Sequence, residues 1–136
     1  MSIEIKGLDG IVEALEKRLS AETNQQILER ACLLLERTAR QKAPKDTGAL
    51  RRSISHRIEG EVGIVFTPLE YAPYVEYGTG LFAEGVGRTD VPWFYKDEEG
   101  KWHETSGMKP QPFMRSALDE NREKIIRMFK EGITNG

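Results

Sequence analysis

The sequence predicts an α+β fold in which helices pack on a small antiparallel β-sheet. Apolar residues recur at helical spacing in three stretches, and short runs between them have the alternation or β-branched content of strands. The predicted order is strand, helix, helix, strand, strand, aromatic arm and helix, with no internal repeat and no linker. Because a chain of 136 residues has the size of one domain, we predict a single domain over residues 1–136.

The N-terminal part predicts a strand and a first helix. Residues 2–6 alternate polar and apolar side chains, as a strand with one buried face does. Gly7 interrupts this pattern, and the apolar residues between positions 8 and 19 then fall on one helical stripe. We therefore expect the first helix to follow the first strand directly.

A second, longer helix is predicted up to Pro44, because the residue before a proline is disfavoured in the helical region. Ser20 or Thr23 is its expected N-cap, and Thr23 with Gln26 fits a capping box. Arg30, Arg37 and Arg40 mostly fall outside the apolar stripe of this helix. The predicted apolar face consists of Ile27, Leu28, Ala31, Leu34, Leu35, Thr38 and Ala39.

A corner and a hairpin follow the second helix. Asp46-Thr47-Gly48 predicts a turn in which Asp46 or Thr47 caps a short helical segment through residues 50–52. Residues 53–58 and 62–66 have strand character and flank Glu59-Gly60-Glu61, which predicts a β-hairpin. Tyrosines then recur at every third position from 71 to 77, which indicates a short helix or turn that Gly78 ends.

Residues 78–109 are predicted to form a long arm. Six glycines alternate with the aromatic runs 93–95 and 102–103, and Asp97-Glu98-Glu99-Gly100 between these runs predicts a second hairpin tip. A loop of this length inside a compact domain is usually functional or disordered, and the aromatic content favours a binding arm. We interpret Gly78, Gly80, Gly85 and Gly87 as hinge glycines of that arm rather than as phosphate-loop fragments.

The last helix is predicted to follow Pro110-Gln111-Pro112, with a proline in its first turn and Gly132 at its C-terminal end. Its predicted apolar face consists of Met114, Ala117, Leu118, Ile125, Met128 and Phe129.

Composition excludes several classes of protein. No apolar run approaches the roughly 18–20 residues of a membrane span, and the first residues do not have the pattern of a signal peptide. The single cysteine excludes an internal disulfide framework and a multi-cysteine zinc site. We therefore expect neither a membrane protein nor a zinc finger.

Charge is distributed unevenly along the chain. Residues 30–57 carry eight Lys/Arg and two acidic residues, whereas residues 58–136 carry nine Lys/Arg and fourteen acidic residues. The basic segment 30–57 is either a solvated helix face, a patch for an acidic partner or sister subunit, or a phosphate-binding surface. A small nucleic-acid-binding protein that uses this segment is thus the alternative function.

Residues with catalytic potential form no recognisable constellation. Cys32 lies in an apolar helical run and is interpreted as a core residue. His56 and His103 lack a second metal-type ligand at helical spacing, and a hydrolase or nuclease that uses either histidine is the least favoured class. We predict no catalytic residues, no metal and no cofactor.

Aromatic residues are concentrated in a short part of the chain. Eight of them fall between residues 71 and 102, where some complete a thin core and part of the surface is expected to bind a partner. Together with the basic helix face and the acidic C-terminal half, this makes head-to-tail self-association physically plausible.

Three motifs carry a resemblance to a known family. They are Ala43-Pro44-Lys45-Asp46-Thr47-Gly48-Ala49-Leu50-Arg51-Arg52-Ser53-Ile54, Tyr71-Ala72-Pro73-Tyr74-Val75-Glu76-Tyr77-Gly78-Thr79-Gly80, and Pro110-Gln111-Pro112-Phe113-Met114-Arg115-Ser116-Ala117-Leu118. In order and spacing they resemble the gp-ten-like tail-component proteins of long-tailed phages and prophages. The resemblance extends from about residue 4 to residue 130, and Ser116 stands where that family often has proline.

The resemblance implies a non-enzymatic structural protein of virion morphogenesis at the neck or the head-proximal end of the tail. Such proteins complete the tail or join it to the head as rings, so the expected partners are other copies of the chain and phage neck and tail proteins. The expected location is the virion, after assembly in the host cytoplasm.

Specific residues are assigned on this basis. Asp46, Thr47 and Gly48 are expected to fix the helix-to-strand corner, Gly78 to end the tyrosine segment, and Pro112 and Phe113 to orient and anchor the last helix. The hypothesised interface residues are Arg51, Arg52, Tyr74, Tyr77, Trp93 and Trp102.

Overall fold

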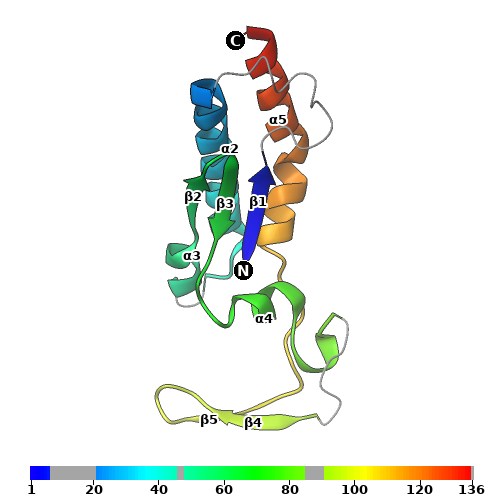
Figure 1. The fold of residues 1–136 in the computed structure, drawn as a ribbon. Helices are drawn as coiled ribbons and strands as arrows, with labels where there is room; N and C mark the ends of the chain where they lie inside the picture. Colours follow the sequence, from blue (N-terminus) through cyan, green and yellow to red (C-terminus); the bar gives the residue numbers. More distant parts are fainter. Residues whose placement is uncertain (7–20, 46–47, 85–90, 136) are drawn as a thin grey trace. The chain divides into compact units, whose positions relative to one another are not determined.

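A computed structural model describes residues 1–6, 21–45, 48–84 and 91–135 (Figure 1). The predicted first helix and the residues Asp46 and Thr47 lie outside the described residues. The chain divides into two compact units, residues Met1–Pro68 with Phe113–Gly136 and residues Leu69–Pro112. The first unit holds two long helices and a three-stranded antiparallel sheet, so the predicted α+β class is confirmed.

The sheet of the first unit has the strand order β1-β3-β2. The strands are β1 (Ser2–Lys6), β2 (Ser55–Glu59) and β3 (Val62–Phe66), and both pairings are antiparallel. The predicted strand at 2–6 and the predicted hairpin are confirmed. The second strand begins two residues later than predicted, because Ser53 still belongs to the preceding helix and its hydroxyl bonds to the Leu50 carbonyl at 2.6 Å.

Helix α2 (Ala21–Lys42) packs against β2 and β3 on one face of this sheet (Figure 1). Six of the seven predicted apolar-face residues are buried, and Leu34 is half-buried. Thr23 lies inside the helix, so the capping box from Thr23 to Gln26 is wrong, and Ser20 lies outside the described residues. Local sequence favoured a cap at Thr23, but Ala21 and Glu22 are themselves good helix formers.

Helix α3 (Ala49–Ser53) forms the corner between α2 and β2. Its N-cap residue is Gly48 at φ 72°, and no side chain caps the helix. The N-cap residue is therefore neither Asp46 nor Thr47, the two residues that the sequence predicts for this role. Leu50 is buried and anchors the short helix in the core. The corner therefore depends on a left-handed backbone conformation that glycine adopts without steric cost.

Helix α5 (Met114–Asn135) lies beside α2 and contacts β1. Its first bond runs from the Ala117 amide to the Phe113 carbonyl, so Pro112 precedes the helix instead of occupying its first turn. Phe113, which directly precedes the helix, is fully buried. The prediction that Gly132 ends the helix is also wrong, because a helix tolerates an internal glycine at a cost of about 1 kcal/mol relative to alanine.

The contact between the two long helices includes a buried polar bridge. The Asn121 side-chain amide donates to the Thr38 hydroxyl at 3.0 Å and to the Ala117 carbonyl at 2.9 Å. Thr38 in turn donates to the Leu34 carbonyl at 2.9 Å. Since a buried polar group is costly only when it lacks a partner, this network fits within the apolar interface.

The second unit contains α4 (Ala72–Tyr77), the 3₁₀ turn η1 (Gly80–Phe82) and a hairpin of β4 (Trp93–Lys96) and β5 (Trp102–Thr105). Gly78 follows α4 as its C-cap at φ 82°, as predicted. Residues 97–101 connect the strands of the hairpin, so the connection contains the predicted tip 97–100 and one further residue, Lys101.

Gly80 has a packing role that the sequence-based interpretation of Gly78 and Gly80 as hinge glycines did not include. Gly80 and Gly107 both have positive φ, and a Cβ on either would overlap backbone atoms beside the other. The Thr79 amide donates to the Met108 carbonyl at 2.9 Å and the Leu81 amide to the Ser106 carbonyl at 3.0 Å. These glycines permit two backbone segments to pack closely, while Gly85 and Gly87 lie outside the described residues.

Candidate interaction surfaces

Exposed apolar side chains are concentrated in the second unit. Of the ten large hydrophobic side chains that are exposed among the described residues, only Ile126 lies outside residues 69–112. The other nine are Tyr71, Tyr74, Tyr77, Leu81, Phe82, Phe94, Tyr95, Trp102 and Met108. Seven of the nine are aromatic, and we call all nine residues together the aromatic surface.

The β4–β5 hairpin has two different faces. Tyr95 and His103 are cross-strand partners that stack with ring centroids 5.2 Å apart, and Trp93 lies on their face. Phe94 and Trp102 lie on the opposite face and expose 64% and 66% of their surface. The two predicted interface tryptophans therefore do not act from one face, because side chains alternate along a strand.

Phe94 is the residue that sequence reasoning missed. Its cross-strand partner is Glu104, and Lys96 pairs with Trp102, so Phe94 and Trp102 are diagonal neighbours on the exposed face. A tip at residues 97–100 would pair Lys96 with Lys101 and place Trp102 on the face of Tyr95, whereas the observed pairing of Lys96 with Trp102 places Trp102 beside Phe94. The sequence prediction was one residue short in this connection, so it did not show that the two rings share a face.

The hairpin tip is held by Asp97. Its Oδ1 accepts from the amides of Glu99 at 3.0 Å and Lys101 at 2.8 Å, and its Oδ2 accepts from His103 Nε2 at 2.6 Å. The hydrogen bond from His103, followed by that from the Lys101 amide, lowers the pKa of Asp97. Glu98 and Glu99 remain exposed at the tip.

Helix α4 presents Tyr74 and Tyr77 to solvent, as the interface hypothesis requires. Tyr74 is 60% exposed and Tyr77 is also exposed, whereas Ala72 and Val75 on the other side of the helix are buried. The spacing of three residues places both phenol rings on one side of this short helix.

The predicted basic residues Arg51 and Arg52 line a hollow together with Arg40 and Gln41, at the junction of α2 and α3. The hollow has a volume of about 390 Å³. Arg51 donates from Nε to the Ala43 carbonyl at 3.1 Å and from Nη2 to the Gln41 carbonyl at 3.3 Å. Arg51 thereby ties α3 to the C-terminal end of α2, in addition to any role on the surface. We call these four residues the arginine hollow.

Arg40 and Lys42 of the basic segment are already paired with acidic residues. Arg40 donates to the Ile54 carbonyl at 2.7 Å and pairs with Glu36 at 3.3 Å, and Lys42 pairs with Glu120 at 3.0 Å. The positive charge that the segment offers to a partner is therefore smaller than its residue count indicates.

His56 is held between two carboxylates of α2. Its Nε2 lies 2.6 Å from Glu29 Oε1 and its Nδ1 lies 3.3 Å from Glu36 Oε2. Burial lowers the pKa of His56, but the hydrogen bond to Glu29 and the charges of Glu36 and Glu29 outweigh it, so the pKa is raised. Both ring nitrogens face carboxylates of α2, so this arrangement leaves neither nitrogen open to a substrate proton or a metal ion.

The remaining candidates for chemistry are not brought together. Cys32 is completely buried, and burial, followed by the charges of Glu29 and Glu36, raises its pKa to about 11. His103 belongs to the other unit and bonds to Asp97. Within the described residues, no group of three His, Cys, Asp or Glu side chains is placed to hold a metal ion.

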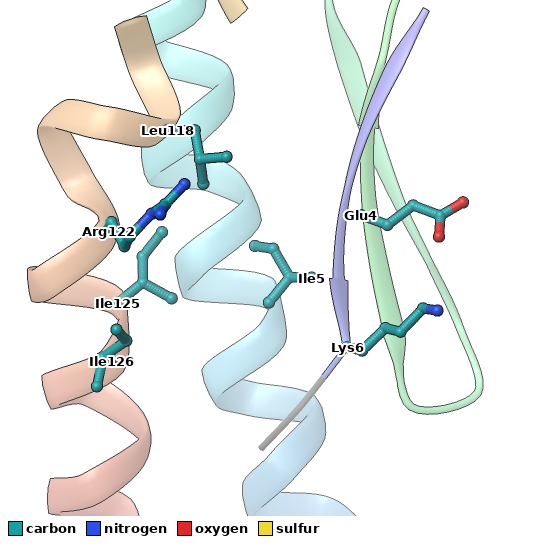
Figure 2. A pocket seen from close by; sticks show the side chains of 7 residues that line it. All are labelled: Glu4, Ile5, Lys6, Leu118, Arg122, Ile125 and Ile126. Atoms are coloured by element: carbon teal, nitrogen blue, oxygen red, sulfur yellow. The ribbon is translucent and has the colours of Figure 1, made fainter. Parts of the chain in front are cut away.

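A second pocket, of about 610 Å³, lies between β1 and α5 (Figure 2). Ile5 points from β1 toward α5, whereas Glu4 and Lys6 point to the opposite side of the strand. The residues of α5 that line the pocket are Leu118, Arg122, Ile125 and Ile126. Its walls are thus mainly aliphatic, which suits an apolar side chain better than a reacting substrate.

The exposed aromatic surface and the arginine hollow are typical of proteins that bind other macromolecules. Among the described residues, no helix is long and apolar enough to cross a membrane. A family model described as "Bacteriophage HK97-gp10, putative tail-component" matches residues 8–78, more than half of the 136-residue chain. The chain therefore belongs to this family of bacteriophage tail components.

The family resemblance read from the sequence is thereby confirmed. The match includes the whole of the motif at 43–54 and most of the motif at 71–80. No curated protein and no solved structure matches the chain. As a tail component, the protein is a structural part of the phage virion.

Proposed function

We propose that this protein acts at the head–tail interface of the virion, in tail completion or head–tail joining, as a ring of identical subunits. It is a non-enzymatic protein that assembles in the host cytoplasm with phage neck and tail proteins. Membership of the tail-component family supports a structural role, and the aromatic surface supports a role in binding.

The exposed face of the β4–β5 hairpin is the observation that carries the proposal. Phe94 and Trp102 together leave most of their ring surface in contact with water. Aromatic side chains of this kind dominate the energetics of protein interfaces because they bury a large area at a low cost in conformational entropy. A hairpin with two such rings is therefore a plausible contact for a neighbouring subunit or neck protein.

The unlike character of the surfaces supports the proposed ring. The aromatic surface and the acidic hairpin tip belong to residues 69–112, while the arginine hollow belongs to the other unit. A contact between two unlike patches on identical subunits is heterologous, and such contacts close into rings when the rotation between subunits permits.

The test is to interrupt the gene in the parent phage or prophage and examine lysates by electron microscopy. Filled heads that accumulate apart from tails, or tails of abnormal length, would support the proposal, whereas normal joined particles would reject it. Complementation with the Phe94→Ala/Trp102→Ala variant should fail. The Lys124→Ala variant, which truncates an exposed side chain of α5, should complement.

Nucleic-acid binding through residues 30–57 is the second candidate, and the arginine hollow is the observation that favours it. Phosphate contacts release counterions, so DNA affinity that falls steeply with salt is its signature. The ion pairs of Arg40 and Lys42 make nucleic-acid binding the weaker of the two candidate functions. Tight binding to duplex DNA at physiological salt would support it instead.

A further inference from the structure

The arginine hollow has unused donor capacity. Arg52 is exposed; its amide donates to the Gly48 carbonyl at 3.0 Å, but its guanidinium group makes no hydrogen bond or ion pair with the described residues. Arg40 and Arg51 bond through Nε and Nη2, which leaves the Nη1 group of each outside these bonds. Guanidinium groups bind carboxylates with paired, charge-assisted hydrogen bonds, so this hollow suits an anionic side chain.

The hairpin tip presents such side chains in a fixed turn. The Asp97 amide donates to the Lys101 carbonyl at 2.9 Å and the Gly100 amide to the Asp97 carbonyl at 3.0 Å. The Asp97 carboxylate adds the bonds to the Glu99 and Lys101 amides. Glu98 and Glu99 are exposed, and no ion pair joins either of them to the described residues. Because the backbone hydrogen bonds already order the turn, binding through these carboxylates costs little additional backbone entropy, and the main entropic cost is that of the two glutamate side chains.

We propose that the hairpin tip of one copy docks through Glu98 and Glu99 in the arginine hollow of a second copy. This inference rests on the proposed self-association and names the contact that orients it. Charge complementarity favours a second copy of the chain as the partner. Every copy carries both the guanidinium groups of the hollow and the two carboxylates of the tip. Exposed ion pairs contribute modestly to affinity, so they set register and partner choice, while Phe94 and Trp102 on the same hairpin bury apolar area.

A copy of the chain fits the hollow better than DNA does. Glu36 pairs with Arg40 beside the hollow, and Glu120 pairs with the adjacent Lys42. These carboxylates reduce the net positive charge along α2. A DNA backbone would run along α2 and meet this reduced charge, whereas a tip with two carboxylates contacts only the hollow.

Charge reversal on each side tests the contact. Variant A carries Arg52→Glu, and variant B carries Glu98→Lys with Glu99→Lys. Sedimentation velocity at low ionic strength should show wild-type oligomers, and each variant alone should need at least roughly tenfold higher concentration to assemble. An equimolar mixture of A and B should assemble as the wild type does.

The mixture separates contacts between copies from contacts within one chain. In a ring of alternating A and B copies, each wild-type tip of A meets a wild-type hollow of B, and each lysine tip of B meets the glutamate of A. Mixing cannot rescue an intrachain contact, because each variant chain keeps its own like-charged pair. Failure of the mixture to assemble would therefore overturn the proposal.

Controls distinguish the remaining outcomes. Arg127→Glu and Glu61→Lys make the same charge reversals at exposed positions elsewhere and should assemble normally. Unchanged assembly of A and B overturns this contact but leaves self-association intact, whereas a wild type that never assembles overturns both. Loss of DNA binding in A, with assembly unchanged, would identify the hollow as a phosphate site and would also overturn the proposal. Melting temperatures confirm that A and B are folded.

Discussion

Gly63 of β3 lies directly against the sulfur of Cys32 on α2. A Cβ atom at position 63 would overlap Cys32 Sγ, and it would contact a methyl group of Leu28 at 3.6 Å. Gly63 occupies the central strand, where it pairs with Ile5 on one side and Ile58 on the other. The absence of a side chain at this position is what allows α2 to approach the sheet closely.

The first prediction concerns this pair. Gly63→Ala should lower the free energy of unfolding by about 1–3 kcal/mol, because the added methyl group overpacks the core. Cys32→Ala alone should cost about 1 kcal/mol through lost burial. The double variant should be less destabilised than the sum of the two changes, since alanine at position 32 vacates the space that the new methyl group needs. Urea denaturation of the four proteins measures the coupling, and strict additivity would contradict the packing described here.

The second prediction concerns the reactivity of Cys32. Because its pKa is raised to about 11 and the side chain is completely buried, the folded protein should react with a thiol reagent at pH 8 only as fast as it opens. In denaturant the same thiol should react rapidly. Labelling followed by mass spectrometry measures both rates, and fast modification of the native protein would place the sulfur at the surface.

The third prediction concerns pH. Since the pKa of His56 is raised in the folded protein, its ion pairs stabilise the fold fully below the unfolded-state value of 6.5, and this contribution is lost as the pH rises through the folded-state pKa. The groups that face the ring are Glu29 and Glu36, and Arg40 pairs with the latter.

His56→Gln should therefore reduce the free energy of unfolding by about 1 kcal/mol at pH 5.5 and by less at pH 8.5. Glu29→Gln should remove much of this pH dependence, because it deletes the shorter of the two contacts. Chemical denaturation over this pH range is the measurement. A difference between wild type and His56→Gln that stays constant with pH would show that folding does not change the pKa of His56.

The fourth prediction contrasts two phenylalanines. Phe113 is completely buried, and Phe113→Ala should cost about 3–5 kcal/mol through lost burial and cavity formation. Phe94→Ala should change the free energy of unfolding by less than about 0.5 kcal/mol, because its ring is exposed. Thermal and urea unfolding compare the two variants. A large loss of stability in Phe94→Ala would mean that its ring is part of a core and not of a binding surface.

Much of the fold could be predicted from the sequence because its signals are local. Alternation over residues 2–6 indicated β1, the helical stripe ending before Pro44 indicated α2, and glycine-containing turns indicated both hairpins. The errors fell at helix ends. Thr23 and Gly132 have the residue types of a cap and a stop, yet packing and propensity extend the helices past them.

The candidate site was predicted less completely. Tyr74, Tyr77 and Trp102 are exposed as the interface hypothesis expects, and the arginine hollow contains Arg51 and Arg52. The sequence did not show that Arg51 also binds the carbonyl groups at the end of α2. That contact depends on a corner that brings residues ten positions apart together, and no local pattern encodes it.

The sequence by itself determined the class of fold, most of its elements and the phage tail-component family, because periodicity, turn chemistry and short motifs are properties of neighbouring residues. Only the tertiary structure decided which side chains meet. It placed His56 between Glu29 and Glu36 and packed Gly63 against Cys32. These contacts join residues far apart in the chain, so they follow from strand register and helix packing, which no single segment of the sequence specifies.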